Sequence, residues 1–598
     1  MIYLGFIQLN QESRHIYDPI NTLALFTSAP PVFTKKGPIT LCYGKLSEEQ
    51  DLDEVWENES SLLIGRIFDK STHRSFSKEK FQGLLNFNKD NLLKDAWGKY
   101  VYLHNNKKTS QIEIVVDSTG QLPFFYYPFP DGSLLFSSSI EIIYKVLAQT
   151  PEYNWEYLCA YLIHGNSSSI QTPFKNIFEL PPACCLTISK NERKIIPFWN
   201  PLNSYQEEKK QSPDVVNILQ DTLKPWIEPY KNVCVSLSGG LDSSSILYCL
   251  KDLVREDQNL TALNYFHSQI KSSNELFYAR KVAHNVGVDL IEVDASESLP
   301  FDPPRNKLPI KPNKPLPGMV SLRWSERTFE QLSYQGSFAF ISGHGSDHIF
   351  MCPPTKRTVA DYFFEKGLKG FKTKLEDVAN FYRDPLFMIF KESMKAGTSY
   401  LFGTREEKRS YQHTLKNLPN WITHDVLERP TNHFAHPIYE VLPKRVLPGK
   451  YDQINFLYDG IASIQIELNK HADPTYYPFL YQPLVEHALS YPTYALFEKG
   501  HDRYPLRRAI GERFNTETIW RRDKSQTTGI FQLGIRNNLK NILELCLEGE
   551  FAKQGLIHKQ SLYKTILLIG SGDIKNMWPF IYLASSELFL KYWNGGNQ

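Results

Sequence analysis

The chain has 598 residues and a net charge of +2, and 41% of its residues are hydrophobic and 22% charged. This length indicates two or more domains, and the near-neutral charge gives no electrostatic basis for binding nucleic acid. No apolar run approaches the roughly 20 residues of a membrane-spanning helix, and the start "MIYLGFIQLNQESRH" lacks a secretion signal. We therefore expect a cytoplasmic protein whose eight scattered cysteines stay reduced.

The first part of the chain is predicted to be rich in β-strands. Short aromatic and β-branched segments separated by turn residues are typical of strands. Such segments lie at 62–68, 99–104, 112–117, 124–129 and 133–139. We predict an α+β domain over residues 1–205.

From about residue 210 the pattern changes to strands that alternate with helices. Apolar spacing predicts a helix after Asp242 and another over 274–287, which ends at Gly287. This alternation predicts a parallel sheet covered on both faces. A proline-dense loop (300–318) follows, and the chain beyond about 355 is mostly helical. The second domain is thus predicted to be α/β with a helical C-terminal extension, over residues 206–598, with strands at 233–238, 260–267, 290–294 and 338–343.

The segment "VCVSLSGGLDSSSILYCL" (233–250) joins a strand to a helix through a glycine-rich turn. Glycines let the backbone approach a ligand, and the helix N-terminus and the serine hydroxyls suit phosphate. A carboxylate at Asp242 is explained if Mg²⁺ lies between it and the phosphates. The alternative is a plain turn with a helix cap. We predict that the loop binds phosphate through Ser236, Ser238, Gly239, Gly240, Asp242 and Ser243.

This segment resembles the pyrophosphate-binding loop of the N-type ATP pyrophosphatases, which adenylate a substrate with ATP. A second segment, "FISGHGSDHIF" (340–350), is similar to the SGxGSDExF segment of asparagine synthetase-like enzymes. The resemblance implies that Asp347 and Asp242 hold magnesium and that Ser342 and Gly343 contact the nucleotide.

Two later segments resemble the same family. "HDRYPLRRAIGERFNTETIWRRDKSQTTGIF" (501–531) is similar to its basic segment, which implies that Lys524 contacts pyrophosphate and the reacting carbonyl. The segment 478–492 resembles the PFLD helix region, with Tyr481 in place of the aspartate.

The segments 117–139 and 177–188 resemble the glutaminase domain of class II amidotransferases. An active glutaminase of that class exposes a cysteine at the mature N-terminus, normally residue 2. Here residue 2 is isoleucine, which has no nucleophilic atom, and the nearest cysteine is Cys42. We expect a degenerate domain without glutamine hydrolysis. The nucleophile would then be another group, most simply an amine on the substrate.

His344 stands where asparagine synthetases carry glutamate and where β-lactam-forming relatives carry a tyrosine base. An α-amine with a pKa of about 8 must lose a proton before it attacks, and an imidazole with a pKa near 6.5 can take that proton. We predict that His344 is the catalytic base. The alternative is a histidine that only binds nearby backbone.

"GHGSDHIF" (343–350) together with "HDRYPLR" (501–507) resembles the lasso-peptide cyclases. That resemblance implies ATP- and Mg²⁺-dependent activation of an Asp or Glu side chain of a leader-cleaved precursor peptide, whose N-terminal amine then closes a macrolactam ring. It also implies a leader peptidase and a leader-recognition protein as partners, and a peptide chamber walled by the helical region 350–475.

Three alternatives remain open. A β-lactam synthetase-type cyclase would carry tyrosine at position 344. An ammonia-dependent asparagine synthetase is disfavoured by His344 and Ile2. A catalytically dead binding protein is disfavoured by the intact Ser238, Asp242, Asp347 and Lys524.

Overall fold

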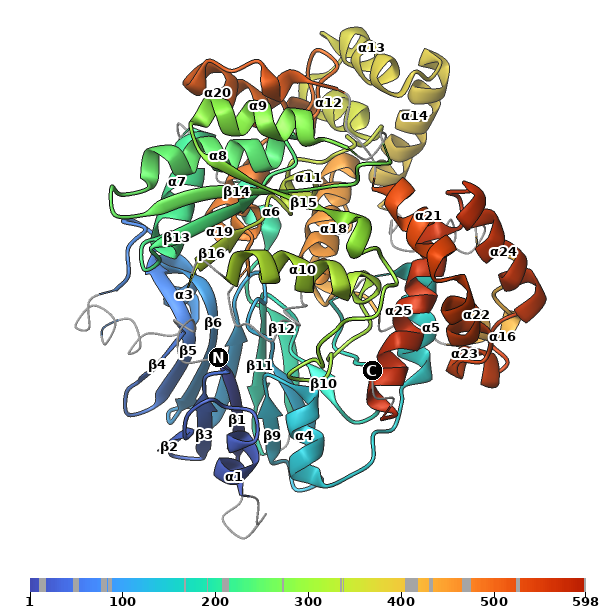
Figure 1. The fold of residues 1–598 in the computed structure, drawn as a ribbon. Helices are drawn as coiled ribbons and strands as arrows, with labels where there is room; N and C mark the ends of the chain where they lie inside the picture. The colour runs from blue at the N-terminus through green and yellow to red at the C-terminus, as the bar shows by residue number, and fades with distance from the viewer. Residues whose placement is uncertain are drawn as a thin grey trace.

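The structure is a computed structural model of the chain. It describes residues 1–598 except for 10–17, 47–52, 77–82, 84–88, 166–167, 191, 207–213, 271–273, 334–335, 337, 404–417, 430–433, 465–474, 523–526 and 596–598. Figure 1 shows the N-terminal β-sheets, the green parallel sheet and the yellow to red helices of the C-terminal part.

The N-terminal region consists of two antiparallel sheets packed face to face. The first sheet runs, in spatial order, β10 (Phe178–Glu179), β8 (Phe125–Pro128), β9 (Leu134–Ser137), β1 (Ile2–Ile7), β3 (Ile39–Gly44) and β2 (Val32–Lys36). The second runs β12 (Arg193–Pro197), β11 (Cys184–Ile188), β7 (Gln111–Val116), β6 (Ala96–Asn106), β5 (Ser61–Asp69) and β4 (Glu54–Glu57).

Both sheets bury their facing sides in one hydrophobic core. Leu41 of the first sheet and Ile64 and Ile114 of the second belong to it, as alternation along each strand requires. Helices α4 (Ile140–Leu147) and α5 (Trp155–His164) pack on the outer face of the first sheet. Short helices α1 (Pro19–Ala24), α3 (Lys89–Asp95) and α6 (Pro201–Gln206) complete the described part of this region.

The second region is built on a parallel sheet with helices on both faces. Its spatial order is β15 (Asp289–Asp294), β14 (Asn259–Phe266), β13 (Asn232–Ser236), β16 (Phe338–Ile341) and β17 (Thr475–Tyr476). Val233 and Val235 face α7 (Val215–Ile227), α8 (Leu241–Leu253) and α9 (Leu276–Val286), whereas Cys234 faces α10 (Leu322–Leu332). The predicted two-sided parallel sheet is therefore confirmed.

The chain after β16 is mostly helical, as predicted. Figure 1 shows α12, α13 and α14 beyond one end of the parallel sheet and α21 to α25 along its side. The helices are α11 (Ser346–Ile349), α12 (Thr358–Lys366), α13 (Phe371–Tyr382), α14 (Leu386–Phe402), α16 (His424–Glu428), α17 (Ile438–Val441), α18 (Pro448–Ser463), α19 (Gln482–Ser490), α20 (Tyr504–Phe514), α21 (Thr528–Asn537), α22 (Leu539–Leu547), α23 (Glu550–Lys553), α24 (Lys559–Ser571) and α25 (Met577–Trp593). Among the described helices, none combines the length and the apolar character needed to cross a bilayer.

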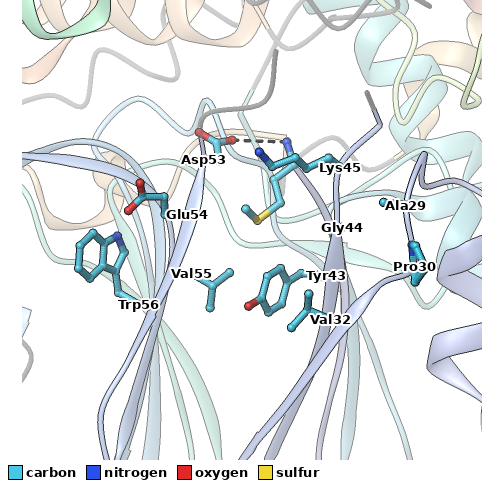
Figure 2. A pocket seen from close by; sticks show the side chains of 11 residues that line it. Ala29, Pro30, Val32, Tyr43, Gly44, Lys45, Asp53, Glu54, Val55 and Trp56 are labelled. Carbon is cyan, nitrogen blue, oxygen red and sulfur yellow. Dashed lines mark hydrogen bonds and ion pairs between the residues drawn. The ribbon is translucent and has the colours of Figure 1, made fainter. Parts of the chain in front are cut away.

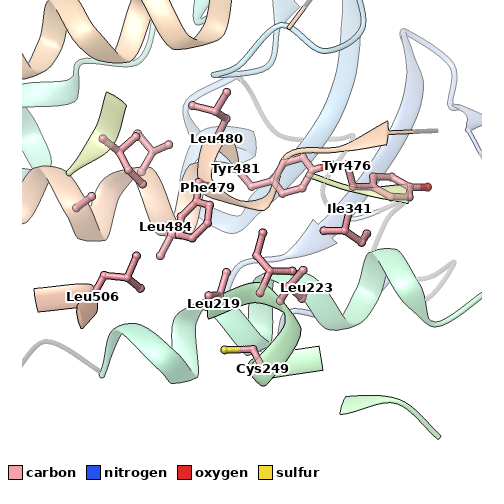
Figure 3. Close-up of a cluster of buried hydrophobic side chains, with 14 of the residues drawn as sticks. Leu219, Leu223, Cys249, Ile341, Tyr476, Phe479, Leu480, Tyr481, Leu484 and Leu506 are labelled. Carbon is pink, nitrogen blue, oxygen red and sulfur yellow. The ribbon is translucent and has the colours of Figure 1, made fainter. Parts of the chain in front are cut away.

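An aromatic cluster joins the two regions. Tyr481 stacks on Trp226 of α7, with ring centroids 4.8 Å apart, and lies 5.9 Å from Trp97 of β6. Arg66 of β5 donates a hydrogen bond to the Pro225 carbonyl at 2.8 Å. Figure 3 shows Tyr481 among the buried side chains of α7, α8, β16 and α20. The tyrosine that replaces the aspartate of the PFLD segment is thus a core residue.

The fold class is confirmed: an α+β region, then an α/β region with a helical extension. Each strand segment predicted from the sequence overlaps a strand, although the segments 133–139, 233–238 and 338–343 each run two residues past the end of theirs. The domain boundary near residue 205 adjoins residues 207–213, which lie outside the described residues, and stays a prediction.

Candidate active site

The site predicted from the sequence lies at the switch point of the parallel sheet, where the order in which strands are added reverses. From β13 the chain builds β14 and β15 on one side, and β16 then pairs on the other side of β13. The loops that leave β13 and β16 therefore both lie at the switch point, at the carboxyl ends of the strands, where open α/β sheets bind ligands. Ser236 ends β13, and Ser342 directly follows β16.

The turn after β13 requires glycine. Gly239 has a φ of +72°, and a Cβ on it would lie 2.6 Å from the backbone nitrogen of Ala279 in α9. Gly240 is the N-cap of α8, and no side chain caps that helix. A helix N-terminus that no side chain of the described residues caps is an arrangement that suits phosphate.

The serines of the turn mostly bind one another. The hydroxyl oxygen of Ser243 accepts from the backbone N–H of Ser238 at 3.2 Å and lies 3.3 Å from the Ser238 hydroxyl. The Ser238 hydroxyl in turn accepts from the backbone N–H of Gly240 at 3.2 Å. In contrast, the buried Ser244 hydroxyl has no hydrogen-bond partner among the described residues. Ser238 and Ser243 therefore shape the turn, and Ser244 keeps an unused polar group beside it.

Gly343 lets the two loops touch. A Cβ on Gly343 would lie 2.9 Å from the backbone nitrogen of Ser243 and 3.2 Å from the Cβ of Asp242. The loop after β16 therefore lies directly against the first turn of α8. This contact brings Asp242 close to Asp347, which lies in α11.

Arg503 joins the two aspartates that the sequence predicts to bind magnesium. Its Nη1 donates to both carboxylate oxygens of Asp242, at 3.0 and 2.8 Å, and also to Asp347. The arginine is only 4% exposed. Burial alone would lower the pKa of Arg503, but Asp242, Asp347 and Asp502 raise it, so the guanidinium stays charged.

The carboxylates of Asp242 and Asp347 fit a cation, because both already converge on one positive group. Hard oxygen donors of this kind suit Mg²⁺. Magnesium could take that position only if the guanidinium of Arg503 moved aside. Within the described residues no three His, Cys, Asp or Glu side chains are grouped to hold a metal, so further ligands would have to come from phosphate and water.

Arg521 is a basic residue of the site that the sequence did not single out. Its Nη2 pairs with Glu275 and lies 3.9 Å from a Cβ placed on Gly240. Its guanidinium covers the ring of Tyr278 at 4.0 Å, and its buried Nη1 has no partner among the described residues. Arg521 thus holds a positive charge beside the glycine-rich turn. Lys524, predicted to contact pyrophosphate, lies outside the described residues.

His344 is held by α18 through one ring nitrogen. Its Nε2 lies 2.8 Å from the Ser463 hydroxyl oxygen and 3.3 Å from the Gly460 carbonyl oxygen. The Ser463 hydroxyl donates to that carbonyl at 2.7 Å, and a carbonyl can only accept. We therefore assign the ring proton to Nε2 and the lone pair to Nδ1.

Burial lowers the pKa of His344, although Gly460, Asp347 and Asp242 oppose the shift. The imidazole is consequently neutral near pH 7. Its Nδ1 has no hydrogen-bond partner in the part of the chain that the structure describes. The backbone contact therefore leaves one nitrogen able to accept a proton.

A separate cavity of about 510 Å³ lies in the N-terminal region, between β2, β3 and β4 (Figure 2). The described residues that line it provide neither a thiol nor an aliphatic hydroxyl. Cys42, on β3, is fully buried, and burial followed by the charge of Asp18 raises its pKa to about 11. Ile2 is also buried, opposite Gly44. The lining residues are Met1, Ala29, Pro30, Val32, Tyr43, Gly44, Lys45, Asp53, Glu54, Val55 and Trp56.

Comparison with known families matches two parts of the chain. Residues 85–199 match the glutamine amidotransferase domain, and residues 217–435 and 471–593 match asparagine synthase.

Two curated relatives are similar to the chain. The microcin J25-processing protein McjC of Escherichia coli is 23% identical over 323 residues, which is 52% of each chain. The putative asparagine synthetase (glutamine-hydrolyzing) 2 of Methanocaldococcus jannaschii is 25% identical over 214 residues, which is 34% of this chain and 40% of that protein. The chain thus spans about half the length, or less, of the curated relatives it matches.

Proposed function

The chain belongs to the asparagine synthase family, and from this premise we propose that it is an ATP-dependent amide ligase that closes the macrolactam ring of a lasso peptide. The relative named for microcin J25 processing supports a peptide as the substrate. The motifs around His344 and Arg503, which resemble those of lasso-peptide cyclases, support ring closure.

One observation carries this proposal. At the switch point between β13 and β16, an uncapped helix N-terminus, a pair of aspartates and a neutral imidazole lie together. The first two features suit a nucleotide with its metal, and the third suits removal of a proton from an amine. An amide ligase that uses ATP needs all three in one place.

In the first step the carboxylate of an Asp or Glu of the peptide attacks the α-phosphorus of ATP, and the bond to the β-phosphate oxygen breaks. The products are an acyl adenylate and pyrophosphate. The backbone at Gly239 and Gly240 and the guanidinium of Arg521 hold the phosphates. Magnesium, when bound at Asp242 and Asp347, would offset the phosphate charge. Lys524 is proposed to contact pyrophosphate and the reacting carbonyl.

In the second step the N-terminal amine of the peptide replaces AMP on the acyl carbon. Nδ1 of His344 takes the proton that the ammonium must lose before it attacks, and the departing AMP phosphate carries away the second proton as the amide forms. Holding amine and acyl carbon together gives effective concentrations that can reach ~10⁵ M, and an enclosed site keeps water from the adenylate. The helical region 350–475 is proposed to form that enclosure.

The N-terminal region, proposed as a degenerate glutaminase-like domain over residues 1–205, takes no part in this chemistry. Its Cys42 thiol remains protonated near pH 7 because its pKa is raised to about 11. We assign ring closure to residues 206–598. The free state of all eight cysteines is consistent with the cytoplasm, where a leader peptidase and a leader-recognition protein would supply the cleaved peptide.

The proposal is tested by incubating the protein with Mg-ATP and candidate leader-cleaved core peptides. We expect the peptide to lose the mass of one water while AMP and pyrophosphate form in equal amounts. The same peptide with an acetylated N-terminus should still drive ATP–pyrophosphate exchange but should not lose water. Formation of ADP and phosphate instead would contradict the proposal.

A further inference from the structure

Helix α14 buries small residues and exposes large apolar ones. Its buried residues are Ile389, Ser393, Ala396, Gly397 and Ser399. Ile389 packs in one cluster with Val359 of α12 and Val378 of α13, which fixes this side of the helix against its two neighbours. The exposed apolar residues of α14 are Leu386, Phe387, Met388, Phe390, Met394, Leu401 and Phe402. A surface helix normally buries its large apolar residues, so this face of α14 is suited to contact a partner.

The exposed face of α14 continues onto α12 and α13, which pack beside it (Figure 1). The ring centroid of Phe390 lies 6.5 Å from that of Phe371 in α13, which lies 5.8 Å from that of Phe363 in α12. Leu368, in the turn between α12 and α13, is 78% exposed. Phe363, Leu368, Phe371 and the exposed apolar residues of α14 together form what we call the α12–α14 surface.

The α12–α14 surface is large for a protein without a partner. Phe387 and Phe402 are 68% and 81% exposed, and these two side chains alone contribute roughly 300 Å². Exposed apolar patches of more than a few hundred Å² mark sites that bind another protein or a membrane. The charges around the surface distinguish between these two kinds of partner.

The charged residues of α12 to α14 leave a surplus of positive charge. The acids that form ion pairs with lysines are Glu376, Asp377, Asp384 and Glu392. Glu365 accepts from Tyr205, and Asp361 accepts from the first backbone N–H groups of α18. In contrast, Lys366, Lys369 and Lys391 have no ion pair among the described residues. The first two flank Leu368 in the sequence, and Lys391 lies one turn before Met394, so the apolar surface has a basic rim.

This arrangement favours a lipid surface over a protein partner. A second copy of the chain would bring the lysines of one copy near those of the other, which opposes association. Protein interfaces concentrate their binding energy in pockets near the centre. Here the most exposed rings, Phe387 and Phe402, lie at opposite ends of α14, about 22 Å apart along its axis. Fluid lipid chains can surround such separate side chains without a matching pocket.

We propose that the α12–α14 surface binds the surface of an anionic lipid bilayer. The apolar side chains enter the boundary between the head groups and the acyl chains, and the lysines place their ammonium groups at the lipid phosphates. Helix α14 has 17 residues, and Lys391, Glu392 and Lys395 interrupt its apolar run, so it lies along the bilayer and does not cross it. The inference does not rest on the proposed function, because it assigns a location to the enzyme and no step of its chemistry.

The test is co-sedimentation of the full chain with vesicles of phosphatidylglycerol or of phosphatidylcholine. Wild type should bind the anionic vesicles at least 10-fold more tightly than the neutral ones, and 0.5 M NaCl should remove this preference. Leu368→Ser and Phe387→Ser should each lower the affinity for phosphatidylglycerol vesicles by about 10-fold. Lys391→Gln should lower it by about 5-fold, the contribution of one basic side chain near an anionic surface. Because these side chains are exposed, the variants should unfold at the wild-type temperature.

Leu25→Ser is the matched control for Leu368→Ser, since Leu25 is 73% exposed at the end of α1 in the N-terminal region. It should bind the vesicles as wild type does. An equal loss of affinity in Leu25→Ser, or no binding of wild type to anionic vesicles, would overturn the inference. A dimer that Phe387→Ser dissociates, without vesicle binding, would assign the surface to a second copy. A higher KM for the core peptide in Phe387→Ser, with unchanged vesicle binding, would assign it to the peptide chamber.

Discussion

The N-terminal region and the region of the parallel sheet differ in how their potentially reactive groups are buried and bonded. In the first region Cys42 is buried with a raised pKa, and Ile2 has no reactive atom. In the second, Arg503 pairs with two aspartates, and His344 keeps a free ring nitrogen at the switch point of the sheet. In the proposed function the first region keeps its fold without chemistry, and the buried charges and incompletely bonded polar groups of the second region mark where the chemistry takes place.

The largest effect should come from the aspartate pair. Asp347→Asn and Asp242→Asn should each reduce ATP–pyrophosphate exchange by about 10³-fold. Each removes a carboxylate that is proposed to hold the magnesium, and the magnesium offsets the phosphate charge. Exchange measured with radiolabelled pyrophosphate tests this. Wild-type exchange in either variant would show that the ATP site does not lie at the switch point.

Removing Arg503 should mainly affect stability. Arg503→Met removes the guanidinium that Asp242 and Asp347 share, which should cost about 3–5 kcal/mol of unfolding free energy. Because Mg²⁺ could then occupy the position of the guanidinium, millimolar MgCl₂ should stabilise the variant more than wild type. Urea unfolding with and without MgCl₂ measures both effects. An equal response of the two proteins to magnesium would contradict the idea that Arg503 and the metal share one position.

Acid should weaken the second region through Asp502. Burial would raise its pKa, but Arg503 and Arg507 lower it to about 2, below its ordinary value of 3.8. A carboxylate with a lowered folded-state pKa stabilises the protein above about pH 4, and this stability is lost as the pH falls towards 2. The loss is about 2 kcal/mol. Asp502→Asn should flatten the pH dependence of the unfolding free energy over that range. An unchanged slope would contradict the assigned ion pairs of Asp502 with Arg503 and Arg507.

The smallest effect is expected in the N-terminal region. Cys42→Ser should leave ring closure at the wild-type rate, since the buried thiol is protonated and lies in the N-terminal region. Wild type should release no ammonia from glutamine, as measured by coupled glutamate dehydrogenase. Ammonia release that disappears in Cys42→Ser would show that the N-terminal region hydrolyses glutamine and would contradict the proposed difference between the two regions.

Much of the fold could be predicted because its strands carry local patterns. The apolar run before Gly239 predicts β13, and the helical spacing after Asp242 predicts α8. Strand β17, at Thr475–Tyr476, was missed because two residues show no periodicity. Its place in the sheet comes from pairing with β16.

The candidate site could be predicted only where its residues belong to local sequence motifs. Asp242, His344 and Asp347 stand in motifs with fixed spacing. Arg503, Arg521 and Ser463 join them only through contacts between segments more than 100 residues apart, and no local pattern encodes such contacts. Tyr481 is the opposite case. It stands where the PFLD segment of the family has an aspartate, but in this fold it stacks on Trp226 in the core.

The most direct test of the account separates the two chemical steps at His344. His344→Ala and His344→Gln, the latter able to hydrogen-bond Ser463, should keep pyrophosphate exchange at the wild-type rate. Ring closure should fall by roughly 10²–10⁴ in both variants, the usual worth of a positioned base. Hydroxylamine should trap the stalled adenylate, and part of the closure should return at higher pH. If either variant instead lost exchange as completely as Asp347→Asn, His344 would belong to the nucleotide site and the account would be contradicted.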